Sequence, residues 1–191
     1  MKTILSKFAR VAATAAVLGL GAGIATTFAA GPVTVDGAPM YAEKNIIENA
    51  VNSKDHTTLV AAVKAAGLVE TLEGPGPFTV FAPVNAAFDA LPAGTVDNLL
   101  KPEMKDTLTK VLTYHVVAGK YSAADLMKKA KAMGGALNLT TVEGDTITIQ
   151  QNGNDLWVFD ETGKAAKITI ADVNQSNGVI HVIDKVLMMK M

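Results

Sequence analysis

Hydrophobic residues recur with a helical period in the first half of the chain and with an alternating period in the second half. In the first half, apolar positions three and four residues apart define amphipathic stretches, several of which end at glycine or proline. The pattern predicts helices over about 41–51, 57–66, 86–91, 95–100, 104–112 and 122–133.

Two of these helices have candidate start signals. Asp55 and Thr57 are both suitable N-caps for the helix at 57–66, and His56 between them is expected to be exposed. Ser122 followed by Asp125 resembles a capping box with Asp in the place of Glu.

From Ala136 onward, alternation and turn residues predict a β meander. The candidate strands are 137–142, 146–150, 156–159, 166–173 and 179–187, separated by turns rich in glycine and asparagine. Helices first and strands later, with few β-α-β alternations, favour an α+β fold over a doubly wound sheet. No internal repeat is visible, which indicates one copy of one module.

The most informative stretch is 78–88, FTVFAPVNAAF. Residues 78–82 are suited to a buried strand, and Pro83 ends the strand because it has no N–H to donate. Asn85 is predicted to cap a helix that turns Phe88 inward. Farther along, Tyr114 to Val117 is predicted as a short strand.

The first 29 residues predict a secretory signal peptide rather than part of the fold. Three basic residues precede a run of small and apolar residues, and Thr27-Phe28-Ala29 provides the small residues of a cleavage site. A retained membrane anchor is the alternative, but the run is shorter than a span of about 20 residues. Residues 30–40, with Pro32, Gly37 and Pro39, are predicted to be a linker without periodicity.

Charge and cysteine content exclude several classes of protein. The formal net charge is −1, and it becomes −4 without the three basic residues of the leader, so nucleic acid is not an expected partner. With no cysteine, the chain has no disulfide, no thiol nucleophile and no thiolate metal site.

Candidate chemistry is sparse. There is no G-x-S-x-G elbow, and the histidines at 56, 115 and 181 lack the spacing of a helical zinc site. His115 and His181 are expected to be hydrogen-bonded groups of the core or its rim rather than ligands. Asp184 is expected to have donors around it, because burying an unpaired carboxylate is costly. We therefore predict no catalytic residue, no metal and no cofactor.

Three stretches resemble the fasciclin (FAS1, beta-Ig-H3) domain family. They are TVFAPVNAAF at 79–88, Tyr114-His115 within LTYHVVAGK, and NGVIHVIDKVL at 177–187. Their order and spacing agree with the family over residues 41–188. One departure is Val84, where the family more often has Thr, which leaves Asn85 as the expected sole cap of its helix.

The resemblance implies a wedge of β-strands flanked by α-helices, and a non-enzymatic adhesion module. It assigns a structural role to the signature residues Thr79, Phe81, Pro83, Asn85, Phe88, Asn177, Gly178, His181 and Asp184. Tyr114 and His115 are the candidate partner-contact residues, because this region is linked to receptor contacts in animal members. Folding alone also explains their presence, and we favour that structural role.

The sequence thus predicts a secreted or periplasmic module that contacts a protein or polysaccharide of the envelope or matrix. The mature chain is expected to have no membrane span. The alternative is a carrier that binds a small hydrophobic ligand, such as a pigment or a lipid, in an apolar cleft, as some microbial and algal relatives do.

Overall fold

The structure is a computed structural model that describes residues 32–35 and 37–190. These belong to one compact unit, Gly31–Met191. The predicted signal peptide, residues 1–29, lies outside the described residues.

The described residues contain seven α-helices, most of them in the first half of the chain. They are α1 (Ile46–Ala50), α2 (Thr57–Ala66), α3 (Val69–Glu73), α4 (Asn85–Asp89), α5 (Thr95–Leu99), α6 (Lys105–Tyr114) and α7 (Ala123–Ala132). Two 3₁₀ turns, η1 (Lys54–His56) and η2 (Pro102–Met104), precede α2 and α6. The predicted capping box of Ser122 and Asp125 is present at the start of α7.

Seven strands form one sheet, in the order β4-β3-β9-β8-β7-β6-β5. Their bounds are β3 (Phe78–Pro83), β4 (Val116–Ala118), β5 (Ala136–Thr140), β6 (Thr146–Asn152), β7 (Asp155–Phe159), β8 (Ala165–Gln175) and β9 (Gly178–Ile183). The strands from β5 to β9 form the predicted antiparallel meander, and β9 then pairs in parallel with β3. The α+β prediction is confirmed.

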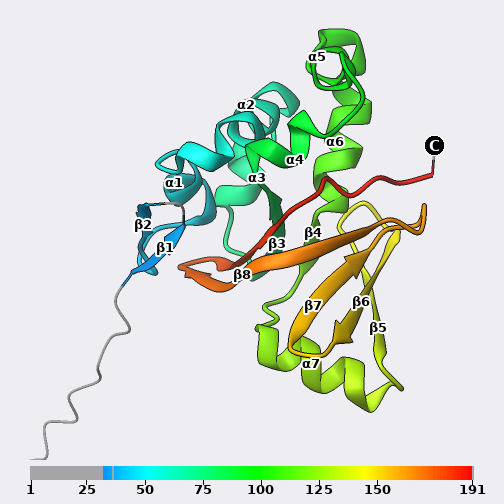
Figure 1. Cartoon of the computed structure of the whole chain (residues 1–191). Coiled ribbons are helices and arrows are strands. Elements are labelled where there is room, and N and C mark those ends of the chain that lie inside the picture. Colours follow the sequence, from blue (N-terminus) through cyan, green and yellow to red (C-terminus); the bar gives the residue numbers. More distant parts are fainter. Residues whose placement is uncertain (1–31, 36, 191) are drawn as a thin grey trace, which may run out of the picture. The chain divides into compact units, whose positions relative to one another are not determined.

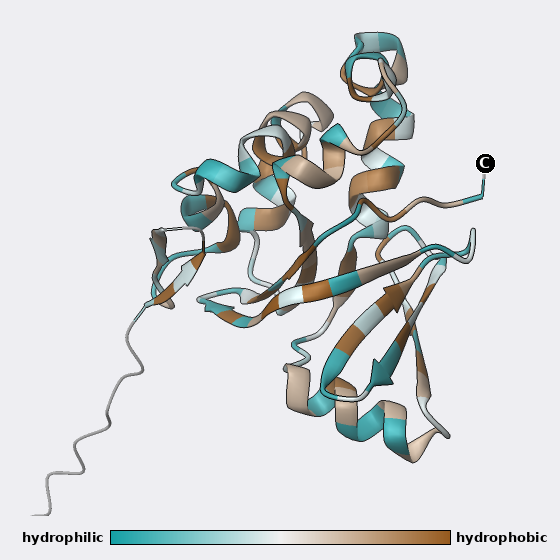
Figure 2. Ribbon diagram, in the orientation of Figure 1, coloured by the Kyte–Doolittle hydropathy of each residue, from teal (hydrophilic) through white to brown (hydrophobic). Residues whose placement is uncertain are grey.

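Helices pack against different parts of this sheet. In Figure 1, α1 to α6 gather beside the part of the sheet formed by β3, β4 and β9, whereas α7 packs against β5 and β6. Brown and paler bands alternate along the strands in Figure 2, as expected for strands with one buried face. Phe81, Tyr114, Leu126 and Ile147 are among the largest fully buried side chains, so the core extends under both groups of helices.

The structure corrects the expectation of an irregular linker over residues 30–40. β1 (Val33–Val35) and β2 (Ala38–Met40) form an antiparallel hairpin that packs against β8. Val35 and Met40 are buried in the core. Strands of three residues are too short to show a period, and β2 also contains Pro39, which is why the pattern missed them.

Three further predictions about local structure are wrong. Tyr114 is the last residue of α6 rather than part of a strand, and His115 follows it before β4 begins. The last strand ends at Ile183, not at Leu187. His56 is buried, with its Nδ1 atom 2.8 Å from the hydroxyl of Ser53.

Candidate functional site

The first and last family signatures lie side by side, because β3 and β9 pair in parallel and in register. Thr79 is opposite Val179, Phe81 is opposite His181, and Pro83 is opposite Ile183. Two stretches about a hundred residues apart therefore form the centre of the sheet.

Thr79 uses its hydroxyl to fix the loop that follows β4. Its side chain is fully buried. The hydroxyl donates to the carbonyl of Gly119 at 2.6 Å and accepts from the backbone N–H of Tyr121 at 2.9 Å. Both hydrogen-bonding functions of this signature residue are thus used inside the domain.

His181 is also fully buried, and its ring stacks on Phe81 with centroids 5.7 Å apart. Nε2 lies 2.8 Å from the carbonyl of Tyr121, and Nδ1 accepts from the N–H of Asp172 at 3.3 Å. These partners fit a neutral ring with the proton on Nε2. Burial lowers the pKa of His181, which favours the same neutral form.

The structural role of Asp172 was not predicted from the sequence. It sits in an irregular part of β8 with a positive φ of 58°, and its carboxylate accepts from the N–H of Ala123 at 2.7 Å. Ala123 is the first residue of α7, so the sheet provides a partner for a free donor of that helix. The position of a bulge, and of an Asp within it, could not be predicted from the alternation of apolar residues in β8.

Asn85 does not cap its own helix, contrary to the prediction. Val84 occupies the N-cap position of α4, with no side-chain hydrogen bond there. The Oδ1 atom of Asn85 instead accepts from the N–H of Thr58 at 3.0 Å and from the hydroxyl of Thr57, and its Nδ2 donates to the carbonyl of Lys54. Asn85 therefore caps the start of α2, an element distant in sequence.

The flanking signature residues Pro83 and Phe88 are buried. Pro83 is the last residue of β3, as predicted, and Phe88 faces inward from α4.

Asn177 connects two short helices to the sheet. Its Oδ1 accepts from the N–H of Ile46 at 3.1 Å, at the start of α1. Its Nδ2 donates to the carbonyls of Leu72 and Gly74 at 2.7 and 3.0 Å, at the end of α3. One amide thus satisfies backbone groups at two helix ends.

Gly178 begins β9 and lies directly opposite Phe78 of β3. A Cβ atom at this position would lie 2.2 Å from the carbonyl oxygen of Phe78. The signature glycine is explained by this close approach, which leaves no room for a side chain.

Asp184 has the donors that were expected. Its Oδ1 accepts from the backbone N–H of Lys167 at 2.7 Å, and its own N–H donates to the carbonyl of Lys167 at 3.2 Å. The carboxylate thereby extends the pairing of β8 with β9 beyond the end of the strand.

Tyr114 has no exposed surface. Its hydroxyl donates to the carbonyl of Thr146 and accepts from the N–H of Glu161, both at 3.1 Å. Burial raises the pKa of Tyr114 to about 12. The hydroxyl thus joins the end of α6 to the turns around β6 and β7.

His115 is 3% exposed and links α6 to the end of the described chain. Its Nδ1 lies 2.7 Å from the carbonyl of Val111, and its Nε2 accepts from the N–H of Leu187 at 2.9 Å. These two partners require a neutral ring, and burial lowers the pKa of His115 to about 4. The side chains of Tyr114 and His115 thus point into the domain, and a role for them in partner contact stays a prediction.

Asp160 is a second residue that the sequence reasoning missed. Its Oδ1 accepts from the N–H groups of Thr162 and Lys164 within its own turn, and its Oδ2 accepts from the N–H of Met188 at 3.0 Å. The turn itself was visible, because Asp at the start of a turn commonly accepts from the following N–H groups. The contact with Met188 depends on tertiary structure.

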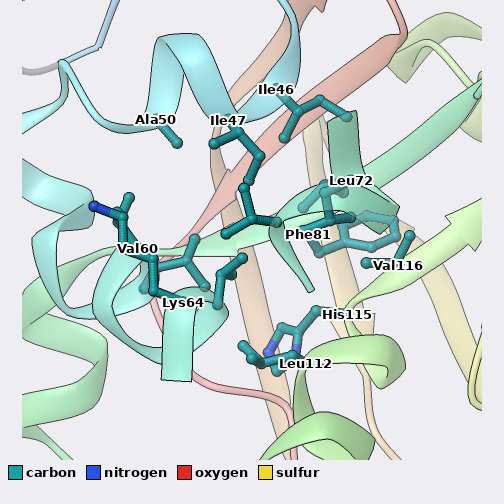
Figure 3. A pocket seen from close by; sticks show the side chains of 14 residues that line it. Ile46, Ile47, Ala50, Val60, Lys64, Leu72, Phe81, Leu112, His115 and Val116 are labelled. Carbon is teal, nitrogen blue, oxygen red and sulfur yellow. The ribbon is translucent and has the colours of Figure 1, made fainter. Parts of the chain in front are cut away.

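An apolar cavity of about 30 Å³ lies between α1, α2, α3, α6 and β3. Figure 3 shows Ile46 and Ile47 on one side of it and Leu112 and His115 on the other. A space of this size accommodates ordered water but is small for an organic ligand.

Neither a metal centre nor a membrane span is found in the described residues. No group of three or more histidine, aspartate or glutamate side chains there is arranged to hold a metal ion. Among the same residues, no helix has both the length and the apolar character to cross a bilayer.

Comparison with known proteins decides the family. The model of the Fasciclin domain matches residues 54–189. The chain belongs to the fasciclin domain family. The resemblance seen in the three signature stretches is thereby confirmed.

Several relatives are similar to this fasciclin domain in sequence, and a solved structure is similar to it in fold. Protein sll1483 from Synechocystis sp. is 44% identical over 188 residues, which cover 94% of this chain and 96% of that protein. The cell surface glycolipoprotein MPB83 of Mycobacterium bovis is 34% identical over 174 residues, which cover 88% of this chain and 71% of the relative. A FAS1 domain pair from the insect cell adhesion molecule Fasciclin I matches with a TM-score of 0.67 and 19% identity, over 76% of this chain and 51% of that structure, which shows the shared fold.

Proposed function

We propose that this fasciclin domain is an exported, non-catalytic interaction module that contacts a protein or polysaccharide of the cell envelope or matrix. Its family membership over residues 54–189 is the observation that carries the proposal. A matching solved structure comes from a cell adhesion molecule, and one relative is named as a cell surface protein.

The use of the signature side chains supports this function. Thr79, Asn177 and His181 direct their polar atoms to backbone groups of the domain, and so does the Tyr114 hydroxyl. A catalytic site needs an acid, a base or a nucleophile directed at a space for substrate. These side chains stabilise the fold instead, which leaves the outer surface for contacts.

Attachment of cells tests the proposed function. A strain that lacks the protein is expected to attach to surfaces less than wild type does, and re-expression of the chain is expected to restore attachment. The purified chain from residue 32 onward should also bind the envelope fraction of its own cells. Equal attachment of both strains, together with no binding to the envelope fraction, would contradict the proposal.

Export is tested separately. Because residues 1–29 have the pattern of a signal peptide, we propose that the mature chain begins near residue 30, in the periplasm or outside the cell. Amino-terminal sequencing of the protein from the periplasm and medium measures this directly. An intact Met1 on the native protein would overturn it.

The carrier alternative needs a cavity of a different size. Sites for small organic ligands usually enclose about 300–1,000 Å³, whereas the apolar cavity here holds about 30 Å³. Binding a pigment or a lipid would require α1 and α2 to move away from β3. A small molecule extracted from natively purified protein would favour this alternative over the interaction module.

A further inference from the structure

The meander has a face whose side chains are partly or fully exposed. Along β5 to β8 the inward side chains are apolar and buried, and the alternate side chains point the other way. We call this side the aromatic face and define it by Asn138, Thr148, Gln150, Trp157, Phe159 and Lys167.

Strand register arranges these side chains in two rows. Asn138, Thr148 and Phe159 are consecutive partners across β5, β6 and β7. Gln150, Trp157 and Lys167 are consecutive partners across β6, β7 and β8. The two aromatic rings are two residues apart on β7, so their Cα atoms are about 6.6–6.8 Å apart along the strand.

Both aromatic side chains keep part of their surface in contact with solvent. Trp157 and Phe159 are half-buried, whereas Leu156 and Val158 on the opposite side of β7 are buried. The main packing partners of β7 are its neighbours β6 and β8, and α7 packs against β5 and β6.

The polar groups beside the rings are uncharged and available. In the part of the chain that the structure describes, the amide of Gln150 makes no hydrogen bond. Asn138 accepts from the hydroxyl of Thr148 at 2.9 Å, which leaves its amide N–H groups to donate elsewhere. Amides offer both donors and acceptors next to the rings.

Charge on the aromatic face is balanced. The ammonium group of Lys167 lies 2.8 Å from the carboxylate of Asp155 at the start of β7. A face with paired charge gives no electrostatic attraction to phosphate or to a strongly anionic chain. Its occupant is expected to be neutral.

We propose that the aromatic face binds an uncharged polysaccharide chain, a partner class that rests on the proposed function. Sugar rings have apolar C–H faces that stack on aromatic rings, and their hydroxyls both donate and accept hydrogen bonds. Trp157 and Phe159 supply the stacking surface. Gln150, Asn138 and Thr148 supply the hydrogen bonds along its side.

Two other occupants fit the face less well. A stable protein interface buries about 800 Å² on each partner around a well-packed apolar centre, whereas this face offers two half-buried rings among amides and hydroxyls. A lipid surface attracts proteins through clustered cations or a larger apolar area, and the one lysine of the face is paired.

The chain contains a single tryptophan, Trp157, so its fluorescence reports on this face alone. The purified chain from residue 32 onward would be titrated with soluble neutral polysaccharides: a β-linked glucan, a mannan and a xylan. Binding is expected to protect Trp157 from quenching by acrylamide and to shift its emission. Alginate, an anionic polysaccharide, is the negative control.

Variants then test the assignment by affinity electrophoresis, in native gels that contain the neutral polysaccharide that wild type binds most tightly. Trp157→Ala and Gln150→Ala are each expected to weaken binding, the first by about two- to tenfold, the range of an aromatic contact. Tyr41→Ala is the matched control, because Tyr41 is 40% exposed and its backbone is hydrogen-bonded to Asn49 of α1, which is not part of this face. If Trp157→Ala is poorly folded, the affinity of Gln150→Ala and the acrylamide quenching of wild type still test whether this face binds the polysaccharide.

The inference is overturned if no neutral polysaccharide protects Trp157, or if Trp157→Ala and Gln150→Ala bind as well as Tyr41→Ala does. Envelope treated with protease separates the two proposals. If wild type still binds the protease-treated envelope and Trp157→Ala does not, the result supports a polysaccharide as the partner of the aromatic face. Binding that is abolished by protease keeps the proposed function and overturns the glycan as partner, whereas a chain that binds glycan but no envelope overturns the proposed function alone.

Discussion

At the scale of single residues, His115 makes the domain sensitive to acid. The pKa of its ring is about 4 in the folded state, against 6.5 for the ordinary side chain, because burial opposes the charge. Between these values the unfolded chain binds more protons, so stability is complete above pH 6.5 and falls as the pH drops towards 4. The contribution of His115 amounts to about 3 kcal/mol.

Denaturant unfolding at pH 7, 5.5 and 4.5 measures this loss. The lowered pKa of His181 acts in the same direction. His115→Gln is expected to be less stable than wild type at pH 7 but to lose less stability on acidification. The slope of its unfolding free energy against pH should correspond to about one proton fewer taken up on unfolding. Parallel pH profiles for the two proteins would refute the assignment.

The hydroxyl of Tyr114 is predicted to matter for stability rather than for binding. Tyr114→Phe removes the hydrogen bonds of the hydroxyl to the carbonyl of Thr146 and from the N–H of Glu161, and two such bonds contribute about 1–3 kcal/mol. Tyr114→Ala also removes a core ring and should cost about 3–5 kcal/mol. Binding of folded Tyr114→Phe to the envelope fraction is expected to equal that of wild type, and weaker binding at unchanged stability would restore the contact role.

Gly178 is predicted to tolerate no side chain. Gly178→Ala places a Cβ against the backbone of Phe78, so β3 and β9 must separate, at a cost of about 3 kcal/mol or more. Gly153→Asn is the control, because the φ of 62° at this open turn suits asparagine. Thermal unfolding compares the two, and equal melting temperatures would mean that the strands accommodate alanine.

The chemistry of these residues could be read from the sequence, but their partners could not. A hydrogen-bonded histidine of the core or its rim was expected at 115 and 181, because each is flanked by apolar or aromatic residues. The N–H that His115 accepts belongs to Leu187, 72 positions later, and only the folded chain brings them together. Local pattern carries no information about such pairs.

At the scale of elements, Asn85 shows how one side chain joins two helices. Asn85→Ala removes the acceptor for the N–H of Thr58 and the donor to the carbonyl of Lys54, and should cost about 1–2 kcal/mol. Asn85→Asp keeps the acceptor and loses the donor, so a smaller cost is expected. Amide exchange should quicken at the start of α2, and unchanged protection there in Asn85→Ala would contradict the assignment.

Periodicity located most of the elements. The amphipathic helices and the meander were found because one face of each is buried and the other is not. The β1–β2 hairpin was missed because each strand has three residues, and the cap at Asn85 was misassigned because preference for a position does not specify which helix is capped. The parallel pairing of β3 with β9 was not predicted at all, since alternation does not state which strands are neighbours.

At the scale of the whole molecule, the segment after β9 closes the core. Val186, Leu187 and Met189 are buried, and two backbone N–H groups of the segment are held by His115 and Asp160. Removal of residues 185–191 is expected to cost about 5 kcal/mol or more, which is comparable with the whole stability of many domains. Near-ultraviolet circular dichroism should show loss of fixed packing. Lys185→Ala, an exposed position, is the control, and a truncated chain as stable as this control would contradict the role.

Function was predictable from the sequence only as far as the family. The three signatures identified a fasciclin domain, and their burial explains why: they specify how the chain folds. The aromatic face could not be recognised beforehand, because Gln150, Trp157 and Lys167 come from three strands whose register the sequence does not give.

The pairing of β3 with β9 also determines when the central sheet can be completed during synthesis. Residue 78 leaves the ribosome long before residue 178, its neighbour in the sheet, so the central strand lacks one of its partners for most of translation. A nascent chain in this condition presents unprotected apolar segments to chaperones rather than a finished domain. Late closure of this kind leaves the nascent polypeptide unfolded for longer, which fits the export proposed above.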